Sequence, residues 1–258
     1  MGVFIDAVAG ALGLCVGSFL NVVIWRLPRR ESLSRPPSHC PGCNAQLRPW
    51  ENVPVLSWIA LRGRCRSCHM RISIRYPIVE MVTAALWTAA AVRIGPHWEL
   101  ADFCVFFAVL VAISGIDLDH QIVPSRIVYP AAGASIVLLG LASVLEHRER
   151  AAVDAVAGGL VGFGLLFLIH VIQPRGMGFG DVRLAGLIGL NVGWLGLARV
   201  GVAMLGGFLL GALVGVGLMA AGRAGRRTRI PFGPFLAAGA VLAVLWGGPL
   251  VNLWLNQG

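Results

Sequence analysis

Long apolar runs alternate with short polar segments along most of the chain. A helix that crosses a bilayer needs about 20 predominantly apolar residues. The runs that meet or approach this length cover residues 3–25, 77–93, 98–116, 127–145, 152–172, 184–198, 200–221 and 231–255. The sixth and seventh runs are the least clearly separated. The pattern therefore predicts an all-α polytopic membrane protein with about eight transmembrane helices.

Composition strengthens this interpretation, because 57% of the 258 residues are hydrophobic and only 13% are charged. A soluble domain carries about 25% charged residues. The first apolar run, residues 3–25, has its basic residues after it rather than before it. A cleavable signal peptide has the opposite order. We therefore expect a retained first helix whose N-terminus lies outside.

Arginine distribution predicts the orientation in the membrane. The chain has no lysine, so all 21 basic residues are arginines. With the N-terminus outside, seventeen arginines flank the cytoplasmic ends of the helices. Four flank the outer ends: Arg93, Arg148, Arg150 and Arg199. This asymmetry agrees with the positive-inside rule. Anionic lipid headgroups at the membrane surface account for the net charge of +9, and no motif indicates nucleic-acid binding.

Four cysteines lie in the long polar segment between the first two predicted helices, residues 26–76. They form two CxxC pairs, Cys40 with Cys43 and Cys65 with Cys68. Such pairs predict a tetrahedral zinc site, and four thiolates would make it structural rather than catalytic. Two disulfides are the alternative, which a reducing cytoplasm disfavours. His39 and His69 adjoin the pairs and are weaker candidate ligands.

Two acids stand at the ends of apolar runs, in a chain with only twelve acidic residues. Asp181 closes the run Gly176-Met177-Gly178-Phe179-Gly180-Asp181, and Asp117 follows residues 98–116. A carboxylate beside a bilayer costs at least about 2.5 kcal/mol, so each acid is a candidate functional group. The predicted topology brings both to the cytoplasmic face.

Two neighbouring carboxylates share one proton, which is the basis of aspartic-protease chemistry. Gly178 and Gly180 permit positive φ and close approach of a substrate, and they precede a helix whose dipole favours an ionised Asp181. Capping of that helix is the alternative role for Asp181. Capping does not explain Asp117, since a negative charge at the end of its own helix opposes the dipole.

Two further acids are candidates for a supporting role. Asp119 competes with Asp117, but it lies two residues further into the loop and is expected to be solvated. Glu80 follows Tyr76-Pro77 and is expected in the first turn of the second helix. An ordinary acid at a helix N-terminus and a role at the active site both remain open for Glu80.

Short motifs follow one another in a fixed order along nearly the whole chain. They are Gly17-Ser18-Phe19-Leu20-Asn21-Val22-Val23, Arg26-Leu27-Pro28, the CxxC pairs, Glu51-Asn52-Val53-Pro54, Ser57-Trp58, Arg62-Gly63-Arg64-Cys65, Arg75-Tyr76-Pro77 with Glu80, Asp117-Leu118-Asp119-His120, Val123-Pro124, residues 176–181 and Pro231-Phe232-Gly233-Pro234-Phe235. In this combination the chain closely resembles the bacterial prepilin peptidases, type IV leader peptidases of the GxGD aspartic protease class with an attached N-methyltransferase activity.

The resemblance implies an inner-membrane endopeptidase that removes the basic leader of type IV prepilins or pseudopilins at the cytoplasmic face. Its two catalytic aspartates carry over to Asp117 and Asp181. It also implies N-methylation with S-adenosylmethionine, for which the sequence offers no recognisable binding motif. Residues 1–98 would then hold the methyltransferase-type region and residues 99–258 a six-helix peptidase domain. Ser125 departs from the family pattern, which usually has an acid there.

Two other classes of function are compatible with the residues alone. An ion-coupled transporter could use Asp117 and Asp181 as proton sites, although transporters usually place such acids near the membrane midplane. A zinc-stabilised membrane scaffold would need no catalysis. The position of both acids at helix ends favours the peptidase.

Overall fold

The structure is a computed structural model that describes residues 2–174, 176–223, 225, 228 and 230–255, without the side chains of 253–255. Four of the arginines counted for orientation, Arg175, Arg226, Arg227 and Arg229, lie outside the described residues. The chain forms two compact units, Met1–Pro96 and His97–Gly258, and each is described by itself. Every regular element within the described residues is a helix. This confirms the predicted all-α fold.

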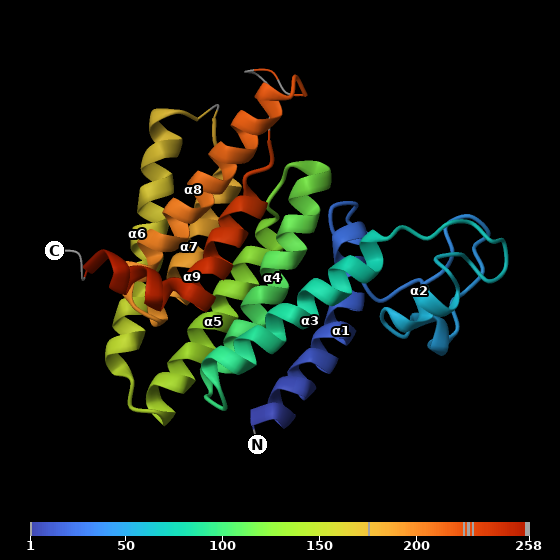
Figure 1. The fold of residues 1–258 in the computed structure, drawn as a ribbon, viewed down its shortest axis with the longest axis horizontal. Coiled ribbons are helices and arrows are strands. Elements are labelled where there is room, and N and C mark those ends of the chain that lie inside the picture. The colour runs from blue at the N-terminus through green and yellow to red at the C-terminus, as the bar shows by residue number, and fades with distance from the viewer. Residues whose placement is uncertain (1, 175, 224, 226–227, 229, 256–258) are drawn as a thin grey trace. The chain divides into compact units, whose positions relative to one another are not determined.

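The first unit is a pair of long helices with a loop domain between them in sequence. The helices are α1 (Gly2–Arg26) and α3 (Arg75–Ile94), and the loop contains the short helices η1 (Pro49–Asn52) and α2 (Leu56–Ala60). Figure 1 shows α1 and α3 side by side, with the loop beyond one end of the pair. The four-cysteine loop thus lies between the first two long helices, as predicted.

Small residues let α1 and α3 approach closely. A Cβ at Gly17 would lie 2.7 Å from the Cα of Glu80, and one at Gly13 would lie 2.7 Å from the Cα of Ala84. Because lipid offers no hydrophobic drive between helices, such backbone contact is a main source of helix association in membranes. Buried Asn21 adds a bond across the pair, from its side-chain amide to the carbonyl of Tyr76 at 3.2 Å.

The second unit contains six helices, α4 (Glu99–His120), α5 (Ser125–Leu145), α6 (Glu149–Ile172), α7 (Phe179–Trp194), α8 (Leu197–Ala220) and α9 (Gly233–Leu255). The tightest packing is between sequence neighbours, α6 with α7 and α8 with α9 (Figure 1). The helix α4 packs against both α5 and α9, and α7 packs against α5, α8 and α9. The ends of α4, α7 and α9 are therefore held within one packed unit.

Each of the eight predicted apolar runs corresponds to a helix in the structure. Seven of the described helices are long and apolar enough to cross a membrane by length and composition. The remaining one is α7, which has 16 residues and begins five residues before the predicted run 184–198. The difference arises because Phe179, Gly180 and Asp181 already belong to its first turn.

Glycines on α6 meet the backbone of α7 directly. A Cβ at Gly162 would collide with the carbonyl oxygen of Ala185, and one at Gly158 with that of Gly189. Gly164 lies on the same helix but has open space where its Cβ would be.

We expect Gly162→Leu to lower the free energy of unfolding by at least about 1–3 kcal/mol, because the side chain must push α6 away from α7. The matched variant Gly164→Leu adds the same atoms without this contact and should unfold like the native chain. Thermal unfolding of the purified protein in detergent measures both. Equal midpoints for the two variants would contradict the packing described here.

Candidate functional site

Asp117 lies in the last turn of α4 and is 4% exposed. Its Oδ2 accepts a hydrogen bond from the backbone N–H of Gly233, the first residue of α9, at 2.9 Å. The N-terminus of α9 carries partial positive charge, which is favourable for a carboxylate. The unfavourable position of Asp117 at the end of its own helix is therefore offset by the start of another helix.

Gly233 leaves room for this carboxylate. A Cβ at Gly233 would lie 2.9 Å from Asp117 Oδ2, closer than ordinary van der Waals contact. Sequence reasoning did not select Gly233 as a site residue. The available signal was the pair Gly233-Pro234 at the start of an apolar run, since proline is favoured in the first turn of a helix.

Asp181 is the third residue of α7, partly buried. Gly178 is the N-cap residue, with φ −71° and ψ 144°, and its carbonyl accepts the N–H of Asp181 at 3.1 Å. Neither Gly178 nor Gly180 takes the positive φ that the sequence allowed for. Gly180 is needed for close approach instead, because a Cβ there would lie 2.8 Å from the Cβ of Val123.

This contact brings the start of α7 onto the segment that follows α4. Val123 is six residues beyond Asp117 in the chain, and it abuts Gly180, the residue before Asp181. The Asp117 carboxylate is near enough for its negative charge to act on the Asp181 carboxyl. The structure thus brings together the ends of α4, α7 and α9 around two carboxylates.

The two supporting acids lie in different settings. Asp119 is exposed in the last turn of α4, as expected of a solvated residue. The sequence suggested that Glu80 lies in the first turn of the second helix. In the structure it lies in the second turn of α3 and is only 6% exposed. Its Oε2 accepts the backbone N–H of Val55 at 2.7 Å. Glu80 is therefore an interior carboxylate that holds the loop, not an acid that simply caps its helix.

The four loop cysteines converge on one point. The ligand atoms of Cys40, Cys43, Cys65 and Cys68 all lie within 4.8 Å of one another. Sγ–Sγ separations of 3.7 Å (Cys40 to Cys68) and 4.0 Å (Cys43 to Cys65) exceed a disulfide bond of about 2.05 Å. Tetrahedral zinc with Zn–S bonds of about 2.3 Å requires sulfur atoms about 3.8 Å apart. The cluster fits such an ion.

Both cysteine pairs are built on the same backbone plan. The N–H groups of Asn44 and His69 donate to the carbonyls of Cys40 and Cys65, and both residues have positive φ. Backbone N–H groups of Cys68 and Ser67 lower the pKa of the Cys65 thiol to about 7, which favours a metal-binding thiolate. Neither His39 nor His69 belongs to the cluster of possible ligands among the described residues.

These features define a class: a polytopic membrane protein with two carboxylates at helix ends and a four-cysteine loop. Comparison with known families extends this. Residues 11–94 match the model of the bacterial peptidase A24 N-terminal domain, and residues 104–219 match that of the type IV leader peptidase family. No solved structure matches the chain.

Curated relatives are similar to this chain over most of its length. One from Stutzerimonas stutzeri is 36% identical over 275 residues, covering 95% of this chain and 92% of its own. One from Pseudomonas putida is 38% identical, covering 93% and 90%. One from Myxococcus xanthus is 42% identical, covering 84% and 64%. Each is named a prepilin leader peptidase/N-methyltransferase. The chain belongs to the type IV leader peptidase family.

Proposed function

We propose that the chain is an inner-membrane aspartic endopeptidase that removes the basic leader from type IV prepilins or pseudopilins, with Asp117 and Asp181 as its catalytic residues. The observation that carries the assignment is the hydrogen bond that fixes Asp117 to Gly233, together with the contact of Val123 with Gly180, the residue before Asp181. Family membership supports the reaction, and the names of the relatives supply the class of substrate.

The chemistry follows from two carboxyl groups that hold one proton between them. The ionised carboxylate accepts a proton from water, and the resulting hydroxide attacks the scissile peptide carbon. The protonated carboxyl donates its proton to the carbonyl oxygen, which gives a neutral tetrahedral intermediate. Collapse of this intermediate breaks the C–N bond as the amine takes the proton from the carboxyl that had activated the water, while the other carboxylate recovers a proton from a hydroxyl of the intermediate. The two roles are assigned to the pair rather than to either residue.

The membrane orientation is part of the proposal. The N-terminus lies outside, and both acids then lie at the cytoplasmic face, where a leader would be cut before the substrate helix leaves the bilayer. The arginine asymmetry supports this orientation. Gly178 precedes Asp181 without a side chain that would block an extended substrate segment, and Gly180 lets Val123 approach the start of α7. Asp119 lies in the last turn of α4, as Asp117 does, and its side chain is exposed, so it can contact the leader.

We assign the two reactions to different parts of the chain. The peptidase occupies residues 99–258, and N-methylation of the new N-terminus with S-adenosylmethionine belongs to residues 1–98. Two observations support the division. The boundary between the compact units falls between Pro96 and His97, and the two family models match on either side of this boundary.

A structural zinc ion completes the proposal. Four thiolates at near-tetrahedral spacing close the coordination sphere, so the ion would stabilise the loop rather than activate water. Such a loop has few other means of stabilisation, because most of its side chains are exposed.

Conversion of either acid to its amide tests the peptidase. We expect Asp117→Asn and Asp181→Asn each to reduce leader removal by at least about a hundredfold, since each leaves a single carboxyl group. Cleavage of a co-expressed prepilin is followed as a size shift on a gel. Asp154→Asn, a carboxylate on α6, is the matched control and should cleave normally. Cleavage that survives in either active-site variant would sink the two-carboxylate mechanism.

Gly233→Ala tests the anchor of Asp117. Its methyl group would crowd Oδ2 and displace the carboxylate, and we expect at least about a tenfold fall in the cleavage rate. The control Gly201→Ala adds a methyl group where the structure has open space. Equal rates for Gly233→Ala and the native chain would show that this close contact does not position the acid.

Metal content tests the cysteine cluster. The purified native protein should contain about one zinc per chain, and the double substitution Cys40→Ser with Cys43→Ser should remove it. Cys104→Ser changes a cysteine in α4 and should leave the zinc in place. Elemental analysis gives the ratio. A metal-free preparation with native stability and activity would refute the zinc site.

A further inference from the structure

The first unit contains a cavity that neither the carboxylate pair nor the cysteine cluster uses. Its volume is about 360 Å³, within the range of small-molecule sites. One wall is a single face of α1, where Ser18, Val22 and Arg26 recur every four residues. Part of the opposite wall is formed by Asn52 and Pro54. Both walls consist of motif residues that the peptidase reaction leaves without a role.

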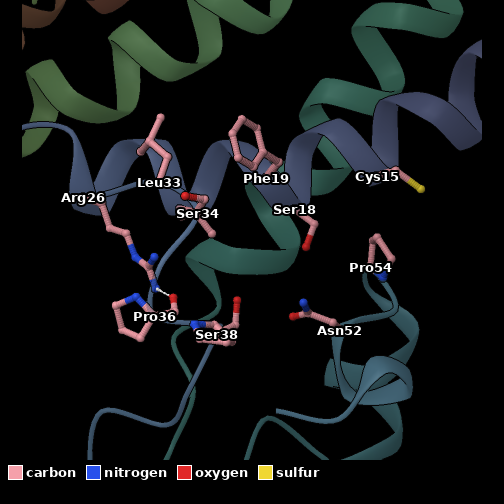
Figure 2. A pocket seen from close by; sticks show the side chains of 12 residues that line it. Cys15, Ser18, Phe19, Arg26, Leu33, Ser34, Pro36, Ser38, Asn52 and Pro54 are labelled. Carbon is pink, nitrogen blue, oxygen red and sulfur yellow. Dashed lines mark hydrogen bonds between the residues drawn. The ribbon is translucent and has the colours of Figure 1, made fainter. Parts of the chain in front are cut away.

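Figure 2 shows how the polar groups are placed around this space. The hydroxyl of Ser18 and the amide of Asn52 point into it at one end. Arg26, Ser34 and Ser38 lie towards the other end. Ser18 and Arg26 are eight residues apart on one helix, which is about 12 Å along the axis. The cavity is therefore long enough for a ligand with two chemically distinct ends.

Arg26 gives the cavity a fixed cationic end. The side chain is 8% exposed, and its guanidinium donates to the carbonyls of Ser32 at 3.0 Å and Pro36 at 2.8 Å. These bonds hold the planar group in one orientation. A guanidinium has five N–H donors, so two bonds leave others for an anion in the cavity. A carboxylate is the ligand group that this geometry suits best.

The other end is backed by a carboxyl group. The Ser18 hydroxyl hydrogen-bonds to Glu80, whose Oε2 also accepts the N–H of Val55, the residue after Pro54. Because the Ser18 proton is directed towards Glu80, the lone pairs of its oxygen can face the cavity and lie against a positive charge. Val55 has φ +59°, unusual for a β-branched residue, and such strain often marks a functional site.

We infer that this cavity binds the methyl donor of the proposed reaction, a sulfonium nucleoside of the S-adenosylmethionine type. Arg26 binds its amino-acid carboxylate, and the Ser18–Glu80 end faces its positive charge. Phe19 and Val22 supply apolar surface for the nucleoside. The lone pair of a substrate amine attacks the methyl carbon, the C–S bond breaks with its electron pair on the sulfur, and the proton released from the nitrogen passes to water. The inference rests on the methyl-transfer part of the proposed function.

The test measures binding to the full-length protein. S-Adenosylhomocysteine, which cannot transfer a methyl group, is titrated calorimetrically into purified native protein and variants. Asn52→Trp places an indole in the cavity from an exposed position, and we expect at least about tenfold weaker binding. Val53→Trp adds the same group one residue further on, where it does not line the cavity, and should bind within about twofold of the native protein.

A second pair of variants tests the cationic end. Arg26→Gln should weaken binding by at least about tenfold, whereas Arg29→Gln, on an exposed arginine in the turn that follows α1, should not. Leader removal and zinc content are measured on every variant and should stay near native, which separates lost binding from lost folding. Native affinity in Asn52→Trp would overturn the inference, and so would a chain that cleaves leaders but binds no S-adenosylhomocysteine. Loss of cleavage in the native chain would instead count against the proposed function.

Discussion

The hydrogen bond between Asp117 and the N–H of Gly233 is the constraint on which the geometry of the second unit depends. A buried carboxylate at the end of its own helix is electrostatically unfavourable, and the start of α9 supplies the compensating donor and dipole. The bond ties the end of α4 to the start of α9. Since Val123 also abuts Gly180, the start of α7 is held at the same place. The two carboxylates are therefore positioned by the helix ends around them.

Glycine contacts determine how these helices can pack. On α6, Gly158 and Gly162 meet the α7 backbone, and in the first unit Gly17 meets α3 at Glu80. In lipid, where apolar side chains gain little by leaving their surroundings, such close backbone contact is a main attraction between helices. It also makes the arrangement intolerant of added atoms. Peptide hydrolysis by two carboxyl groups requires a fixed distance between them, and closely packed helices can provide it.

Buried charges in the first unit have a different role, because they hold loop backbone. Arg26 donates to two carbonyls, and Glu80 accepts the N–H of Val55. The cysteine cluster brings the two CxxC turns of the loop together. Each group lies at the end of α1 or on α3, or in the loop that connects them. The loop has little apolar core, so polar anchors define its shape. The cavity between the loop and α1 is lined by one of these anchors, Arg26, together with serines, Asn52 and apolar residues.

The sequence by itself determined the helices, because the bilayer imposes length and hydropathy on each span, and it determined the cysteine cluster through the CxxC spacing. Alternation of the spans also indicated that Asp117 and Asp181 share one face. The tertiary structure alone decided the rest. The partner of Asp117 is a backbone N–H, and so is one of the two partners of Glu80, which lies one turn further into its helix than the sequence suggested. Every residue except proline carries that donor, so no residue type marks it, and only packing selects which one meets the carboxylate.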